Sequence, residues 1–192
     1  MTSFSHQSYI LRKKVFKLFG GAFHIFAPNG ALVFYSRQKA FKLKEDIRVY
    51  SDESMGQELL VMKARNVLDI AATYDVTDPF FGVRVGALRR KGLKSILKDE
   101  WIILDAQDRE IGLIQEDSTA LALLRRFVLG WLLPQTYQGT VGGQAVCEFK
   151  RNFNPFVSKV SLDFTMDSSG RLDRRLGIAA AVLLLAIEGK QK

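Results

Sequence analysis

The stretch Leu176–Ile187, which reads LGIAAAVLLLAI, decides the fold because it is apolar on every side of a helix. A helix without a polar face must be covered by protein all round, and a flat sheet covers only one of its sides. At 1.5 Å per residue the uncharged part is about 16–18 Å long, which is close to the length of a strand. A closed antiparallel sheet wrapped around the helix covers every side and leaves no exposed strand edge.

The sequence therefore predicts a central helix over residues 171–188. Asp167, Asp173 and the Ser168-Ser169-Gly170 turn suit the positive end of this helix. Small residues would let the barrel wall approach the helix axis, namely Gly177, Ala179, Ala180, Ala181 and Ala186. The residues expected to fill the core from the helix are Leu176, Ile178, Val182, Leu183, Leu184, Leu185 and Ile187.

Hairpin-like units fill the chain before the helix, each with an alternating or apolar run, a polar turn and a second run. They cover residues 22–35, 47–64, 69–90, 101–116 and 136–149. Asn29-Gly30 is a strong short hairpin signal, and the Gly142-Gly143 pair suits a two-residue turn with positive φ at both central residues. With further runs at 9–18 and 157–164, we expect a mainly β (α+β) fold, a closed antiparallel barrel of about twelve strands around a hydrophobic C-terminal helix.

The 192 residues contain no linker and no low-complexity run, so we expect one domain over residues 1–192. Residues 1–7 precede the first expected strand and are predicted to form a flexible tail. Short helices are expected at about 93–97 and 117–133. The twelve-residue apolar stretch of the last helix is shorter than the about 20 residues that a membrane span needs.

The net charge is +8, and its excess lies at the start of the chain. Residues 1–50 contain nine Lys and Arg against two Asp and Glu. Such a field favours anionic partners, which include acidic lipid headgroups, nucleic acid and acidic proteins, although a solvated basic face explains the same count. Cys147 is the single cysteine and cannot form an intrachain disulfide, which favours a reducing, cytoplasmic location.

Catalytic and metal motifs are absent from the sequence, which contains no HExxH, CxxC, GxSxG, GxGxxG or Walker pattern. His24 lies in an apolar run, where a structural histidine is the expected role. Cys147 has no neighbouring cation to lower its pKa and is expected to be a packed thiol. We therefore expect no catalytic residue, no metal site, no cofactor and no enzymatic activity.

Two groups of cations are candidates for binding an anionic headgroup. The first contains five side chains at a strand end and in the short helix after it: Arg89, Arg90, Lys91, Lys94 and Lys98. The second contains Arg12, Lys13 and Lys14, although alternation along a strand sends these neighbours to opposite faces. Both groups can equally be solvated turns and strand faces. Nucleic acid is not an expected partner, because few aromatic residues alternate with the cations.

Six segments resemble the LURP-one-related family: YILRKKVFKL at 9–18, FHIFAPNG at 23–30, WIILD at 101–105, IGLIQED at 111–117, FNPF at 153–156 and LDRRLGIAAA at 172–181. The resemblance covers about residues 8–189. This family belongs to the tubby C-terminal-like superfamily, to which the phospholipid scramblases are related. The resemblance implies a twelve-stranded barrel that encloses a hydrophobic C-terminal helix, in agreement with the pattern of the residues.

The functional implication of the resemblance is binding. Tubby domains bind phosphoinositide headgroups through basic residues on the barrel, so the resemblance implies a non-enzymatic module for anionic phospholipids, peripheral at the membrane. A structural or protein-interaction barrel without a lipid ligand is the alternative. Scramblase features are missing, since the segment from Asp163 to Asp173 has no glycine at the sixth place of a calcium loop and no glutamate that closes a twelve-residue loop.

Overall fold

The computed structural model describes seven segments of the chain: residues 2–16, 20–38, 46–65, 72–91, 100–116, 135–152 and 158–187. They contain a short 3-10 helix, η1 (Thr2–Phe4), and one α-helix, α2 (Arg174–Ile187). The strands are β1 (Ser8–Phe16), β2 (Gly20–Phe26), β3 (Leu32–Gln38), β4 (Asp46–Tyr50), β5 (Glu58–Ala64), β6 (Thr73–Asp78), β7 (Val83–Arg90), β8 (Glu100–Leu104), β9 (Glu110–Glu116), β10 (Gln135–Val141), β11 (Gln144–Arg151) and β12 (Ser158–Asp163).

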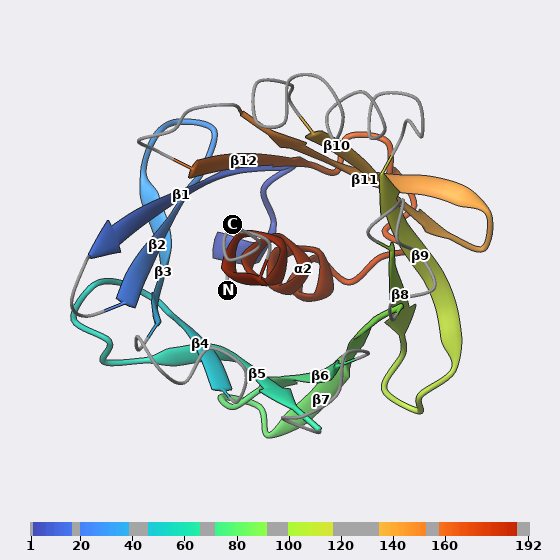
Figure 1. The fold of residues 1–192 in the computed structure, drawn as a ribbon, viewed down its shortest axis with the longest axis horizontal. Coiled ribbons are helices and arrows are strands. Elements are labelled where there is room, and N and C mark those ends of the chain that lie inside the picture. Colours follow the sequence, from blue (N-terminus) through green and yellow to red (C-terminus); the bar gives the residue numbers. More distant parts are fainter. Residues whose placement is uncertain are drawn as a thin grey trace, which may run out of the picture.

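The strands form one closed barrel in which each strand pairs with the next along the chain and β12 closes onto β1 (Figure 1). All pairs are antiparallel, and the closing register places Leu11 opposite Val160. The predicted mainly β barrel around a C-terminal helix is therefore confirmed. Its strands form because their residues alternate, as in β6, where every second side chain is buried.

Helix α2 runs through the middle of the barrel, with its surface covered by strands on all sides (Figure 1). Its side chains from Leu176 to Ala186 are buried, as the apolar pattern predicts. The close fit depends on small residues: a Cβ added to Gly177 would lie only 2.4 Å from Cζ of Phe164. The side chain of Ile187 and the helices expected at 93–97 and 117–133 lie outside the described residues.

The helix begins at Arg174, three residues later than predicted, because two aspartates hold the preceding residues in a turn. The carboxylate of Asp167 accepts hydrogen bonds from the backbone N–H groups of Arg171 (2.8 Å) and Leu172 (3.1 Å). Asp173 caps the helix by accepting the N–H of Arg175 at 2.9 Å. The expected role of both aspartates at the positive end of the helix is confirmed.

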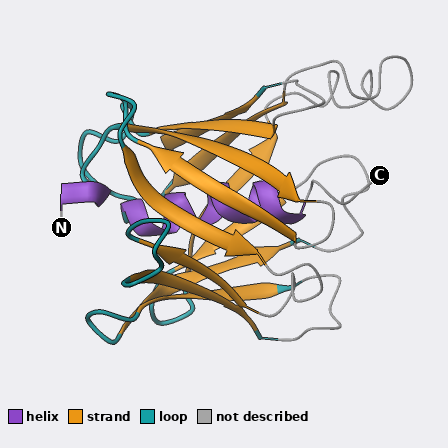
Figure 2. Ribbon diagram, turned by 90° about the vertical axis from the view of Figure 1, so that its left-hand side faces the viewer, coloured by secondary structure: helices purple, strands orange, loops and turns teal. Residues whose placement is uncertain are grey.

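One end of the barrel carries the hairpin turns after β2, β4, β6, β8 and β10, together with the loop from β12 into α2. Figure 2 shows these turns gathered at the end where α2 begins, and we call this the turn end. At the turn after β10, Gly142 and Gly143 have φ values of 57° and 76°, as the sequence predicts. Gly30, with φ 83°, completes the turn after β2.

Residues 2–7, expected to be a flexible tail, contain η1 and make specific contacts at the turn end. The ring of Phe4 lies 4.6 Å from that of Phe34, and Phe4 packs against the core. The hydroxyl of Tyr9 donates to the carbonyl of Ser3 at 2.8 Å and accepts the backbone N–H of His6 at 3.2 Å. An aromatic partner and satisfied hydrogen bonds thus order this segment.

A helix long and apolar enough to cross a membrane is not found in the parts of the chain that the structure describes.

Candidate functional site

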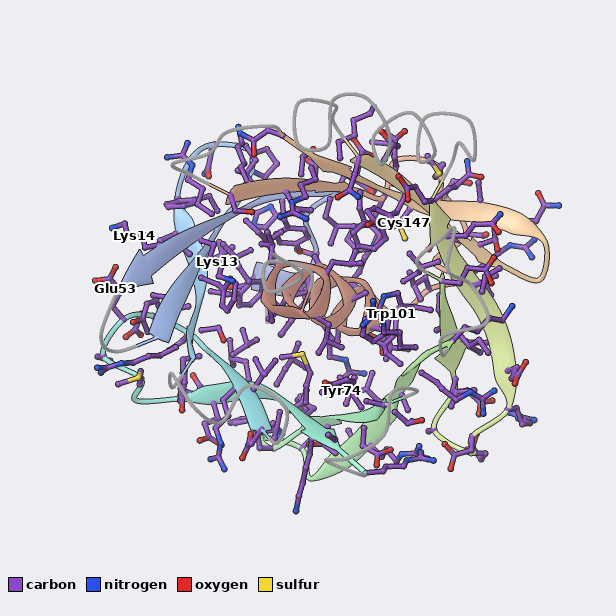
Figure 3. The ribbon with its side chains drawn as sticks, viewed as in Figure 1. Lys13, Lys14, Glu53, Tyr74, Trp101 and Cys147 are labelled. Carbon is purple, nitrogen blue, oxygen red and sulfur yellow. The ribbon has the colours of Figure 1, made fainter. Side chains whose placement is uncertain are left out.

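Alternation along β1 separates the cations that the sequence groups together. Figure 3 shows Lys13 inside the barrel and Lys14 on its outer side. Tyr9 and Leu11 are buried in the core, so Lys13 shares their inward face, whereas Arg12 and Lys14 are exposed on the outer wall. The expected splitting of this group is confirmed.

Lys13 interacts with the last turn of the central helix. Its Nζ donates a hydrogen bond to the carbonyl of Leu185 at 3.1 Å and lies 5.5 Å from the centre of the Phe23 ring. A cation at this position stabilises the negative end of the helix. The structure therefore gives Lys13 a contact inside the barrel, away from the outer surface on which a lipid headgroup would bind.

Arg12 lies on the outer wall directly opposite Lys159 of β12. On its other side it is in register with His24 of β2, and its guanidinium lies 5.1 Å from the centre of the Phe26 ring. Two like charges directly opposite each other on neighbouring strands destabilise a sheet. Their presence therefore calls for a reason other than folding.

Lys14, further along β1, and Arg37 of β3 extend the positive surface. Both are in register with Ala22 of β2, which leaves two exposed cations on either side of a small residue. We call the outer-wall residues Lys159, Arg12, Lys14 and Arg37 the basic strip. Within the described segments, none of the ion pairs involves a member of this strip.

The outer wall around β4 to β9 is different, because its arginines are paired with acids. Arg84 donates to the carboxylates of both Asp75 and Asp108. Arg65 contacts the same two acids. The hydrogen bonds from Arg84 and Arg65 hold the pKa of Asp108 below its usual range. These pairs neutralise one another, so this side of the wall offers less uncompensated positive charge than the basic strip.

The cluster predicted at residues 89–98 is also divided by alternation. Arg89 forms an ion pair with Glu110, and Lys91 Nζ lies 2.9 Å from a carboxylate oxygen of Glu100. Arg90 lies on the inward face of β7, in register with Trp101. Burial raises the pKa of the Tyr74 hydroxyl, and the positive charge of Arg90 opposes part of this rise. Figure 3 shows Tyr74 and Trp101 inside the barrel.

Lys94 and Lys98 lie outside the described residues. Lipid binding by the 89–98 cluster stays a prediction, but the charges of Arg89 and Lys91 are already engaged within the protein.

His24 and Cys147 show no arrangement for catalysis. His24 is 7% exposed, and its Nε2 lies 2.6 Å from a carboxylate oxygen of Glu53. Its ring packs between those of Phe26 and Tyr35, which agrees with the predicted structural role. Cys147 is a buried thiol whose pKa is raised by desolvation to about 12, as expected for a packed side chain. No group of three metal-ligating side chains occurs among the described residues.

The sequence did not identify Lys159 and Arg37 as members of a site. Each follows the alternation of its own strand, so its outward direction is readable from the pattern. Their proximity to Arg12 and Lys14 is not readable, because it depends on the register of β12 on β1 and of β3 on β2. No sequence pattern indicated that Glu53, in the turn after β4, would contact His24 either.

A comparison with family models identifies the family of this chain. A family model described as LURP-one-related matches residues 33–185, more than three quarters of the chain. The chain belongs to the LURP-one-related family. The match begins in β3, so this family member carries Arg37 and Lys159 within the matched span and Arg12 and Lys14 before it. No curated protein and no solved structure matched the chain.

Proposed function

We propose that this LURP-one-related protein is a non-enzymatic binding module that attaches peripherally to anionic phospholipid surfaces through the basic strip. The observation that carries the proposal is the register pair of Arg12 and Lys159, two like charges with no carboxylate partner among the described residues. Such a pair destabilises the sheet, and phosphate oxygens between the two side chains would remove the repulsion.

The position of the strip suits a surface rather than a small pocket. Its members come from β12, β1 and β3 and face outward from one side of the wall, with neighbouring strands about 4.8 Å apart. Each basic residue near an anionic membrane contributes about 1 kcal/mol. The strip therefore supplies enough attraction for reversible attachment that weakens as salt is added.

The family resemblance and the expected cellular compartment support the same proposal. The tubby C-terminal-like superfamily, to which the family resemblance points, contains domains that bind phosphoinositide headgroups through basic residues on the barrel. Cys147 is a free, buried thiol, which fits a reducing compartment and hence a cytoplasmic protein that reaches the membrane from that side.

Liposome flotation tests the proposal with two double charge reversals that change the net charge equally. The strip variant is Arg12→Glu with Lys159→Glu, and the matched control is Arg89→Glu with Lys91→Glu. Vesicles of phosphatidylcholine with phosphatidylserine or a phosphoinositide should float the unmodified protein at low salt. The strip variant should lose at least about thirtyfold in apparent affinity, the equivalent of two cations.

The control variant should lose clearly less, because Arg89 and Lys91 are already paired with acids. A larger loss in the control than in the strip variant would move the site to the 89–98 cluster. Failure of the unmodified protein to float with any of these vesicles at low salt would leave a structural or protein-interaction barrel as the function.

A further inference from the structure

Several large apolar side chains are exposed at the turn end of the barrel. Among the described residues, the large hydrophobic side chains that are exposed are Leu32, Met55, Phe80, Phe81, Val83 and Met166. All of them lie in or beside the turns after β2, β4 and β6 or in the loop from β12 into α2, the end shown in Figure 2. None lies midway along the described barrel wall, so within the described residues the exposed apolar side chains form a group at the turn end.

The most exposed of these side chains stand on a rigid support. Phe80 is 65% exposed and Phe81 49%, with their rings 4.9 Å apart and nearly perpendicular. Oδ1 of Asp78 accepts the backbone N–H of Phe80 (3.1 Å) and of Phe81 (3.3 Å). The other carboxylate oxygen lies 2.9 Å from Arg175 in the first turn of α2. The turn thus presents two aromatic rings that lose little conformational freedom on binding.

The outer wall changes from apolar to basic with distance from the turn end. Three rows follow from the registers of β1, β2 and β3: first Ile10, Phe26 and Leu32, then Arg12, His24 and Tyr35, then Lys14, Ala22 and Arg37. Successive rows are two residues apart, or about 6–7 Å along a strand. The side chains therefore change from apolar in the first row to a cation with aromatic neighbours in the second row and to two cations in the third.

Several acids at the turn end are paired with basic side chains, whereas Asp52 in the turn after β4 is hydrogen-bonded to Ser51 and Ser54. Glu53 is bound to His24, and Asp78 and Asp173 are bound to Arg175. Asp108 is bound to Arg65 and Arg84. Because these carboxylates are engaged, they oppose an anionic surface less than their number indicates.

We infer that the turn end enters the bilayer, with the apolar turns at the boundary between headgroups and acyl chains and the basic strip at the level of the phosphates. This inference rests on the proposed function and adds the orientation and depth of binding. The headgroup region of one leaflet is about 5–8 Å thick, which matches the spacing from the apolar row to the first cationic row.

Site-specific labelling tests the depth of insertion. A single cysteine is introduced by Phe81→Cys at the turn end or by Lys63→Cys on the exposed wall of β5, and each is coupled to an environment-sensitive fluorophore. Cys147 is buried, so the unmodified protein serves as the labelling control. With vesicles of phosphatidylcholine and phosphatidylserine, the label at position 81 should shift to the blue and be quenched by acyl-chain nitroxides. The label at position 63 should do neither.

Affinity provides a second measurement. Phe80→Ser with Phe81→Ser removes two half-exposed rings and should weaken vesicle binding at least about tenfold, with an unchanged melting temperature because both rings are exposed. In the strip variant, by contrast, the salt dependence of binding should flatten.

Three results would overturn the inference. Vesicle binding that depends on the strip, with an unquenched label at position 81 and full affinity in the Phe80 and Phe81 variant, would refute insertion and leave the proposed function standing. No binding by the unmodified protein would refute both. A dimer in sedimentation experiments that dissociates in the Phe80 and Phe81 variant, without a change in vesicle binding, would assign these rings to a second copy of the chain.

Discussion

Replacement of Gly177 by alanine tests how closely α2 packs against the barrel wall. The new Cβ would lie 2.4 Å from Cζ and 2.5 Å from Cε1 of Phe164, well inside the contact distance of about 3.4 Å at which such atoms normally stop. The Phe164 ring would therefore have to move by about 1 Å. It is fully buried, edge-on to Tyr9 at 6.2 Å, and covered by the Arg174 guanidinium at 4.3 Å.

Two effects of opposite sign decide the change in stability. Overpacking in a well-filled core costs about 1–3 kcal/mol. Alanine in place of glycine gains up to about 1 kcal/mol of helix propensity, and less in the first turn of a helix, where Gly177 lies. The packing cost exceeds the gain, so Gly177→Ala should lower the free energy of unfolding by about 0.5–2 kcal/mol.

Urea unfolding followed by tryptophan fluorescence measures this change, which should move the midpoint without changing the slope. In the background of Phe164→Leu, which removes the clashing ring atoms, Gly177→Ala should become neutral or stabilising. A coupling energy of at least about 1 kcal/mol between the two positions is expected. If Gly177→Ala stabilised the unmodified protein by the full propensity gain, the contact between the helix and Phe164 would be refuted.

Substitutions at three further positions test the interior. Leu184→Ala should cost about 2–5 kcal/mol in urea unfolding through lost burial and a cavity, and a soluble, cooperatively folding Leu184→Lys protein would contradict a buried helix. Lys13→Met keeps the apolar stem but loses the hydrogen bond to the Leu185 carbonyl, and should cost about 1–2 kcal/mol in the same assay. Because burial raises the pKa of Cys147 from 9.0 to about 12, the folded state holds this proton more tightly than the unfolded chain. Stability should therefore be complete below pH 9 and fall as the pH rises towards 12, and Cys147→Ala should reduce that fall in unfolding titrations.

The architecture was predictable because the apolar pattern leaves few alternatives. A helix without a polar face needs cover on all sides, and repeated alternating runs with glycine turns supply it. The start of α2 at Arg174 rather than 171 depends on how Asp167 distributes its hydrogen bonds, which propensity alone does not resolve. The contacts of Phe4 were missed for a related reason, since its partner Phe34 comes from a distant strand.

The candidate site was less predictable, because neighbours in the sequence are not neighbours on a strand face. Arg89 and Arg90 are adjacent in the chain, yet one pairs with Glu110 on the outer wall and the other turns inward beside Trp101. Arg12 and Lys159 are far apart in the chain and directly opposite in space. A dense run of cations on a strand is therefore a weaker sign of a binding surface than cations at alternate positions of paired strands.

The central helix also constrains where this protein can recognise a ligand. Because side chains of α2 and of the described wall pack into one hydrophobic core, the described residues that remain for binding lie on the outer wall and at the turn end. Both ends of the helix contact the wall. Near its start, Arg175 forms an ion pair with Asp78, which precedes the turn that carries Phe80. Near its end, the Leu185 carbonyl accepts a hydrogen bond from Lys13 of β1. The strand that carries Arg12 and the turn that carries the exposed phenylalanines are thus held by the same helix. The apolar stretch that specifies the fold therefore also fixes the distance and orientation between the two surfaces through which we propose that the protein contacts a membrane.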